Sequence, residues 1–171
     1  YWELVYEGKC EAIPHLFVIA DEFAELKTSQ ETFLKLLKKI SDQYITDPNN
    51  IYDPTCGSGS LLTEYARFNN TIPFYGKELN AIPAMLCRMN MIIHNVRDFK
   101  ISQCDTLLTY DKEEKEKYDL IFANPPFGIP WNKSALREDD ERFNDKPLPN
   151  KELADWAFIY HIIYTLNKNG L

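Results

Sequence analysis

Short apolar runs alternate along the chain with longer segments whose apolar residues recur at helical spacing. The four runs are Ile51–Asp53, Ile72–Leu79, Phe99–Cys104 and Leu120–Ala123. Strands that alternate with helices predict an α/β fold with a parallel sheet and helices on both faces. We expect the first run at the centre, the second and third on one side of it, and the fourth on the other, because the winding reverses after the third strand.

Four segments have the spacing of amphipathic helices. Thr28 and Glu31 match a capping box, in which each side chain satisfies a free backbone amide, so a helix is expected to begin there and to end before Pro48. Asn80 is expected to cap the third helix. The expected buried faces are Phe33, Leu36, Leu37 and Ile40 in the first helix, Leu61, Leu62, Tyr65 and Phe68 in the second, Ile82, Met85, Leu86, Met89 and Ile93 in the third, and Leu153, Trp156, Ala157, Tyr160, Ile163 and Tyr164 in the fourth.

The composition is that of a soluble globular domain with a real core, since 171 residues include 44% hydrophobic and 26% charged residues. No apolar run is long enough to span a membrane, and no signal peptide is visible, so the cytoplasm is the expected compartment. The four cysteines form no CxxC pair and no cluster with the three histidines, which supports neither a metal site nor a disulfide framework. A net charge of −7 without a basic patch indicates that a nucleic-acid substrate would require a partner or a further domain.

The segment YDLIFANPPFG combines a strand with unusual chemistry at its end. Proline cannot donate to a sheet ladder, so the apolar run must stop at Pro125 and Pro126. Asn124 then lies at the carboxyl edge of the sheet, where open α/β sheets bind ligands. The Asn124 amide, the Pro125 carbonyl and the Phe127 ring suit a flat substrate that bears an amino group. The alternative for these residues alone is a strand followed by a proline turn.

A glycine turn follows the first strand, in the sequence Asp53-Pro54-Thr55-Cys56-Gly57-Ser58-Gly59-Ser60. A strand, a glycine turn and a helix form the first unit of a Rossmann-like sheet, where backbone amides can hold a ligand. Leu62 occupies the place of the third glycine of a dinucleotide fingerprint, and no Walker lysine follows. The turn therefore favours an adenosine ligand without phosphate, of which S-adenosylmethionine is the obvious candidate. A tight structural turn is the alternative.

Two acids end the next two strands. Glu78 lies about 20 residues after the glycine turn, the spacing of an acid that accepts hydrogen bonds from a ribose diol. Asp105 also stands at a carboxyl end, where it could accept from an adenine amino group. The alternatives are a solvated strand end for Glu78 and a turn aspartate for Asp105.

Two irregular segments complete the chain. Tyr110–Lys117 is rich in charge and is expected to be a solvated linker. Gly128–Asn150 has no clear period, and its length predicts either a functional lid or a disordered segment, which we expect to be mobile in the absence of DNA.

The motifs TSQE, DPTCGSGS, ELN, CDT, NPPF and ADWAFIYH occur in an order that resembles amino-methyltransferases. More narrowly, residues 28–171 resemble the modification (M) subunit of type I restriction–modification systems, an adenine-N6 DNA methyltransferase. The resemblance implies S-adenosylmethionine as cofactor, DNA as substrate, and specificity and restriction subunits as partners. NPPF also occurs in RNA and protein methyltransferases, so an RNA or protein-glutamine methyltransferase and a non-catalytic cofactor-binding fragment stay open as alternatives.

The resemblance also implies a role for each motif. Thr28, Ser29, Gln30 and Glu31 match the motif beside the methionine end of the cofactor, although family members often have proline where Ser29 stands. Asp53, Thr55, Cys56, Gly57, Ser58, Gly59 and Ser60 match the glycine-turn motif, Glu78 the ribose ligand and Asp105 the adenine ligand. Asn124, Pro125, Pro126 and Phe127 match the catalytic motif.

The expected organisation is an amino-terminal segment of uncertain structure, residues 1–27, and a partial catalytic domain, residues 28–171. The family's further strands would follow residue 171, so we expect the sheet to be truncated before its fifth strand. Leu120–Ala123 would then be an edge strand with unpaired backbone groups.

Overall fold

The structure, a computed structural model, describes residues 39, 41–45, 47–144, 148–149 and 154–171. Most of the expected first helix, the candidate residues Thr28, Ser29, Gln30 and Glu31, and the expected boundary between residues 27 and 28 lie outside the described residues. Within the described ranges, no helix is long and apolar enough to cross a membrane. The same ranges contain no group of three or more His, Cys, Asp or Glu residues placed to hold a metal ion.

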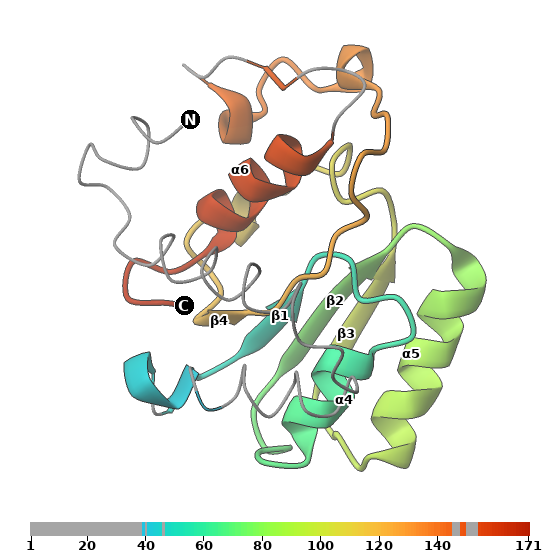
Figure 1. The fold of residues 1–171 in the computed structure, drawn as a ribbon, viewed down its shortest axis with the longest axis vertical. Helices are drawn as coiled ribbons and strands as arrows, with labels where there is room; N and C mark the ends of the chain where they lie inside the picture. Colours follow the sequence, from blue (N-terminus) through green and yellow to red (C-terminus); the bar gives the residue numbers. More distant parts are fainter. Residues whose placement is uncertain (1–38, 40, 46, 145–147, 150–153) are drawn as a thin grey trace, which may run out of the picture.

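A four-stranded parallel sheet forms the centre of the molecule (Figure 1). Its strands are β1 (Ile51–Asp53), β2 (Phe74–Glu78), β3 (Phe99–Gln103) and β4 (Leu120–Ile121). Their order is β3-β2-β1-β4, and the register sets Ile51 opposite Phe74 on one side and Leu120 on the other. The predicted order and direction are confirmed, while each of β2, β3 and β4 is shorter than the apolar run that predicted it.

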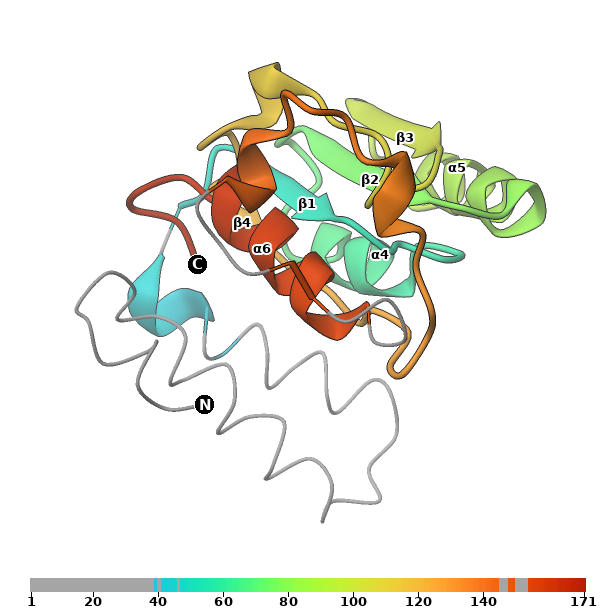
Figure 2. The same ribbon diagram turned by 90° about the horizontal axis from the view of Figure 1, so that it is seen from above.

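Helices cover both faces of this sheet, which confirms the predicted fold class (Figure 2). They are α4 (Ser60–Ala66), α5 (Ala81–Ile93) and α6 (Asp155–Thr165). Side chains that alternate along each strand enter different cores. Ile51 and Phe74 pack with α4 and α5, whereas Tyr52 and Tyr118 pack on the α6 side.

The apolar stripe of α5 faces away from the sheet, so the expected buried face of this helix is wrong. Ile82, Met85, Met89 and Ile93 are between 50% and 72% exposed, and Leu86 is 41% exposed. Ala84, Cys87 and Met91 are buried instead. Small residues are needed there because α5 lies against the glycine turn, where a Cβ atom on Gly59 would come within 2.6 Å of the Cys87 Sγ.

The other two helices also differ from expectation. Leu62 and Tyr65 of α4 are buried as predicted, but the helix ends at Ala66 and leaves Phe68 51% exposed. On α6 the buried residues are Ala157, Phe158, His161 and Thr165, so Ala157 is the one fully buried residue among the described members of the expected face, and Leu153 lies outside the described residues. The face is rotated because His161 and Thr165 make buried hydrogen bonds that an apolar pattern does not reveal.

The irregular segments carry three single 3-10 turns: η1 (Lys112–Glu114), η2 (Lys133–Ala135) and η3 (Glu141–Phe143). The expectation of a solvated linker is wrong at Glu114, which is buried and forms an ion pair with Lys77 at 2.6 Å. Beyond the NPPF motif, Trp131 and Phe143 are buried in a second core with residues of α6. The chain after the motif is thus packed against α6 over much of its described length, and its mobility without DNA stays a prediction.

Backbone groups on the outer side of β4 are paired, in contrast to the expected open edge. Leu171 donates its N–H to the Asp119 carbonyl at 2.8 Å and accepts from the Ile121 N–H at 2.8 Å. The Tyr118 carbonyl accepts from the Asn167 N–H at 2.8 Å. The chain that leaves α6 therefore covers this side of the strand.

Candidate functional site

The predicted ligands of the cofactor and the NPPF motif meet at one edge of the sheet, because the strands are parallel and all four carboxyl ends point the same way (Figure 1). Asp53 ends β1 and Glu78 ends β2. Asp105 follows β3 by two residues, and Asn124 follows β4 by three. Of the predicted site residues, those outside the described ranges are Thr28, Ser29, Gln30 and Glu31.

The glycine turn is open where a ligand could approach it. Gly57 has a φ of +53°, and a Cβ atom built there would meet nothing within 4 Å. Gly59 has a φ of +85° and lies against Cys87, so it needs glycine both for conformation and for space. Ser58 accepts a hydrogen bond from Asn90 Nδ2 at 2.9 Å through its carbonyl, which fixes the turn to α5.

Other residues of the turn act through their backbone. Cys56 is buried, and its N–H donates to the Lys77 carbonyl at 2.9 Å. The Cys56 thiol lies in the core near Gly76, where an added Cβ would be 2.9 Å from the sulfur. The Thr55 N–H donates to Asp53 Oδ1 at 2.9 Å, and Ser60 begins α4.

The Glu78 carboxylate links the glycine turn to the start of α5. Its Oε2 accepts from the Gly57 N–H at 3.1 Å. Its Oε1 accepts from the Asn80 N–H at 2.7 Å and from Asn80 Nδ2 at 3.2 Å. A carboxylate has about four acceptor sites, so Oε2 retains one for a further donor.

Asp53 is fully enclosed beneath the same turn. Burial raises the pKa of its carboxyl to about 7, the hydrogen bonds from Thr55 oppose this shift, and the nearby charge of Glu78 adds to it. The Asp53 side chain is therefore a support of the turn, since its accessible surface is only 1%.

Asp105 closes the turn after β3. Its Oδ1 accepts from the Leu107 N–H at 2.9 Å and from the Leu108 N–H at 3.2 Å. The Thr106 hydroxyl donates to the Pro54 carbonyl at 2.6 Å, so this turn is tied directly to the glycine-turn motif. Both the turn-aspartate alternative and a ligand role remain open, because Oδ2 is not used by these bonds.

The NPPF motif follows β4, which lies on the side of β1 opposite to β2. Phe122 is still bonded to β1, through its N–H and the Tyr52 carbonyl at 3.0 Å. Asn124 and Pro126 are exposed, and Phe127 is 78% exposed. Gly128 follows with a φ of +66° and donates its N–H to Asp155 Oδ1 at 3.2 Å. The first turn of α6 thus holds the end of the motif.

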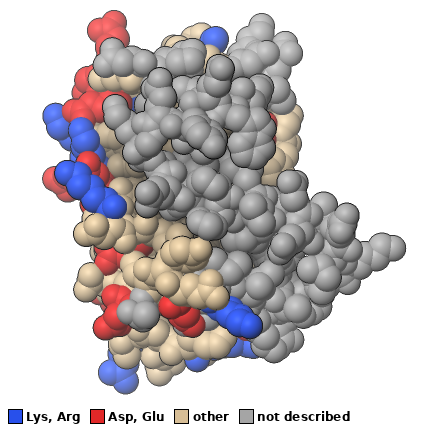
Figure 3. Space-filling view, turned by 60° about the vertical axis from the view of Figure 1, so that its left-hand side comes forward, with Lys and Arg blue, Asp and Glu red and all other residues tan. Residues whose placement is uncertain are grey.

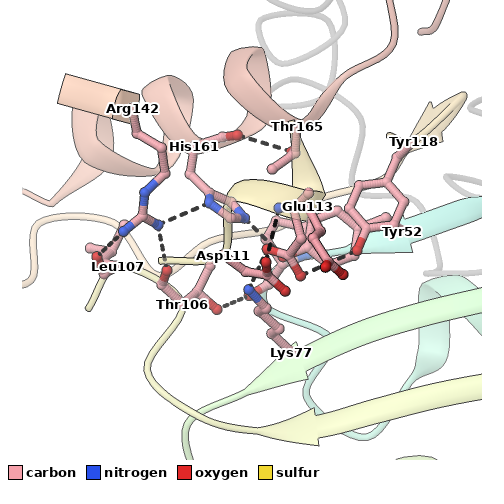
Figure 4. A network of polar contacts seen from close by, with 12 residues as sticks. Tyr52, Lys77, Thr106, Leu107, Asp111, Glu113, Tyr118, Arg142, His161 and Thr165 are labelled. Atoms are coloured by element: carbon pink, nitrogen blue, oxygen red, sulfur yellow. Dashed lines mark hydrogen bonds and ion pairs between the residues drawn. The ribbon is translucent and has the colours of Figure 1, made fainter. Parts of the chain in front are cut away.

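A buried polar network lies between α6 and the sheet (Figure 4). Tyr52 Oη lies 2.8 Å from His161 Nε2, and Arg142 Nη1 lies 3.1 Å from His161 Nδ1. A guanidinium can only donate, so Nδ1 accepts and the histidine proton is on Nε2, which donates to Tyr52. Burial, with the charges of Arg142 and Lys77, lowers the pKa of His161 well below its usual value.

Sequence reasoning missed this network, although one signal was present. Lys77 lies inside the predicted strand Ile72–Leu79, and an ammonium buried in a sheet requires an acid partner. That partner is Glu114, from the segment that was expected to be solvated.

Acidic and basic side chains are mixed on the face shown in Figure 3. Ion pairs join Lys112 and Lys115 to Glu141, both at 2.9 Å, and Arg137 to Asp139 at 2.7 Å. These three basic side chains are therefore neutralised by acids and do not form a basic patch of the kind that binds a phosphate backbone.

Comparison with known proteins identifies the family. The family model described as N-6 DNA methylase matches residues 25–171. The chain belongs to the N-6 DNA methylase family. A type I restriction enzyme methylase subunit, MpnII of Mycoplasma pneumoniae, is 34% identical over 154 residues, which are 80% of this chain and 28% of the relative. The MjaVIII methylase subunit of Methanocaldococcus jannaschii is 37% identical over 145 residues, 73% of this chain and 24% of the relative.

These relatives confirm the resemblance to type I modification subunits. This chain spans about a quarter of their length. Among solved structures, a modification subunit of a putative type I restriction enzyme from Vibrio vulnificus has a TM-score of 0.53 at 19% identity, covering 85% of this chain and 38% of that one. A chain from a type I R-M system, solved in a study of complex assembly and conformational transition, has a TM-score of 0.61 at 22% identity, covering 81% and 29%. These likenesses show that the N-6 DNA methylase chain shares their fold.

Proposed function

We propose that this chain carries the catalytic site of an adenine-N6 DNA methyltransferase, as part of the modification subunit of a type I restriction–modification system. The observation that carries the proposal is the meeting of the NPPF motif and the glycine turn at one sheet edge in a chain of the N-6 DNA methylase family. DNA, a specificity subunit and a restriction subunit are the proposed partners, and the cytoplasm is the proposed compartment.

The residues at the glycine turn fit S-adenosylmethionine. The open space beside Gly57 admits a ligand to the backbone, and Glu78 Oε2 has one acceptor site for a ribose hydroxyl. Asp105 is proposed to accept from the adenine amino group through Oδ2, since the bonds to Leu107 and Leu108 use Oδ1. Thr28, Ser29, Gln30 and Glu31 are proposed to line the methionine end. When bound, the cofactor would supply the methyl group.

Asn124 and Pro125 are proposed to activate the target amine. The lone pair of adenine N6 is delocalised into the ring, so the amine is a poor nucleophile. Hydrogen bonds from N6–H to the Asn124 side-chain oxygen and the Pro125 carbonyl stabilise the positive charge that develops as the new bond forms. Pro126 stiffens the turn that presents both acceptors.

Phe127 is proposed to hold the target base. An adenine inside a duplex cannot reach this edge, so it must be flipped out of the stack. The exposed Phe127 ring offers a face for stacking, which typically contributes about 1–3 kcal/mol per base. Asp155 holds Gly128 and so fixes the direction in which the motif leaves the sheet.

Transfer of a radiolabelled methyl group tests the proposed substrate. The complete subunit with its partner subunits is incubated with labelled S-adenosylmethionine and, separately, with DNA, RNA or a protein release factor. We expect label on adenine N6 of DNA alone. Label on RNA or on a glutamine side chain would replace the proposal with one of those methyltransferase classes, and cofactor binding without transfer to any substrate would leave only a binding role.

A further inference from the structure

Arg142 is a buried side chain whose guanidinium makes five hydrogen bonds, and no motif points to it. Its side chain is 1% exposed. Nε and Nη2 donate to the two Asp140 carboxylate oxygens at 2.9 and 2.6 Å. Nη1 donates to the Thr106 carbonyl at 2.8 Å and to His161 Nδ1, and Nη2 donates to the Leu107 carbonyl at 2.7 Å. All five donors of the guanidinium are therefore used.

Two of these bonds end on the turn that Asp105 closes. Thr106 and Leu107 follow Asp105 directly, and the Leu107 N–H is itself bonded to the Asp105 carboxylate. The Thr106 hydroxyl continues to the Pro54 carbonyl in the glycine-turn motif. Arg142 thus donates to two backbone carbonyls of this turn, those of Thr106 and Leu107 (Figure 4). The Leu107 N–H of the same turn donates to the Asp105 carboxylate.

We propose that Arg142 is a positioning residue for the adenine end of the cofactor site, an inference that rests on the proposed function. It fixes the turn after β3, and the turn fixes the direction of the Asp105 carboxylate. Because Arg142 lies in η3, the same bonds couple that direction to the chain that follows the NPPF motif. One side chain therefore links the turn of Asp105 to the segment that follows the NPPF motif.

Lysine could not replace this arginine. A lysine has three donors on one nitrogen, whereas Arg142 reaches two carbonyls, a carboxylate and an imidazole in different directions. Arg142→Lys would leave at least one of these buried acceptors without a partner and would loosen the turn. Partners that orient ligand-binding groups typically change affinity or activity by about 10- to 100-fold in metal sites, and we expect an effect of that size here.

Arg137 offers a matched control on the same segment. Its Nε and Nη2 donate to Asp139 at 2.8 and 2.7 Å, the same two-residue spacing as Arg142 and Asp140, but the pair is exposed. The test is calorimetric titration of S-adenosylmethionine into the complete, partner-bound enzyme, with thermal unfolding measured in parallel. We expect Arg142→Lys to raise the Kd by about 10- to 100-fold at a temperature where the enzyme is folded, and Arg137→Lys to leave it unchanged.

A purely structural Arg142 would give a different pattern. A lower Tm with a Kd within twofold of the wild type would overturn the inference. If Arg142→Lys does not fold, Asp140→Asn keeps Arg142 but removes the charged partner of its fork, and it is expected to weaken cofactor binding in the same direction; an unchanged Kd there would also overturn it. A wild-type enzyme that binds no S-adenosylmethionine would instead reject the proposed function, whatever Arg142 does.

Discussion

The acids at the carboxyl edge differ in how much of their acceptor capacity the protein itself uses. Glu78 bonds three donors and keeps one site free, whereas Asp53 is enclosed and bonded only within its own turn. Single substitutions can therefore distinguish the two roles. Glu78 is expected to contact the ligand, and Asp53 is expected to support the turn.

Glu78→Ala should weaken S-adenosylmethionine binding. A hydrogen bond to a charged acceptor typically contributes roughly 1.5–3 kcal/mol, so the Kd is expected to rise by about 10- to 100-fold. Isothermal titration of the complete subunit measures this, with Asn80→Ala as the control, because Asn80 bonds Glu78 Oε1 but not the free site on Oε2. An unchanged affinity for Glu78→Ala would reject the ribose assignment.

Asp53→Asn should stabilise the protein at neutral pH. The folded-state pKa of about 7 lies above the ordinary aspartate pKa of 3.8, so the folded protein holds a proton that the unfolded chain releases. Asp53 therefore lowers stability progressively as the pH rises from about 4 through 7, by an amount on the order of a few kcal/mol.

Asparagine keeps the oxygen that accepts from Thr55 and cannot ionise. Urea unfolding at pH 4 and pH 8 should thus show equal stability of wild type and variant at the lower pH and a more stable variant at the higher pH. A constant difference across this range would mean that Asp53 is not titrating as its burial requires.

At the scale of elements, strand order followed from the sequence and helix orientation did not. Strand segments and the turn residues that bound them were sufficient to place β1 to β4, and the pattern was clearest for β4, whose residues are apolar and buried on both faces. The stripe on α5 has helical spacing on its exposed side, so periodicity alone assigned the wrong face. Small residues at Ala84 and Cys87, opposite the glycine turn, were the available signal.

Two of the three methionines of α5 test its orientation. Met91 is fully buried and Met89 is 50% exposed on the same helix. Met91→Ala should lower the free energy of unfolding by about 2–5 kcal/mol, through lost burial and a cavity. Met89→Ala should change it by less than about 0.5 kcal/mol. Chemical denaturation of both variants compares them, and a larger loss at Met89 would show that the helix is turned the other way.

The buried polar network could not be predicted from the sequence for a related reason. His161, Arg142 and Glu114 come from segments that are far apart in the chain, and only the fold shows that they face Tyr52 and Lys77. The motif residues, in contrast, could be placed because each follows a strand, and parallel strands bring their ends to one edge.

At the scale of the whole molecule, the charge balance limits what this domain does with DNA. The net charge of the chain is −7, and Lys112, Lys115 and Arg137 are paired with acids. We therefore expect this chain alone to bind duplex DNA weakly, with a Kd in the nonspecific range of about 10⁻⁴ to 10⁻⁶ M at physiological salt. Fluorescence anisotropy with and without the specificity subunit tests this, and nanomolar binding by the chain alone would contradict it.

The most direct test of the catalytic assignment is Asn124→Ala in the complete, partner-bound enzyme. Loss of one acceptor already in place typically costs on the order of 10²–10³ in rate. Formation of N6-methyladenine, quantified by mass spectrometry under saturating cofactor, should therefore fall by that factor while the Kd for S-adenosylmethionine stays unchanged. Loss of cofactor binding in step with activity, or activity within a few-fold of the wild type, would contradict the role of Asn124 at the transferred methyl group.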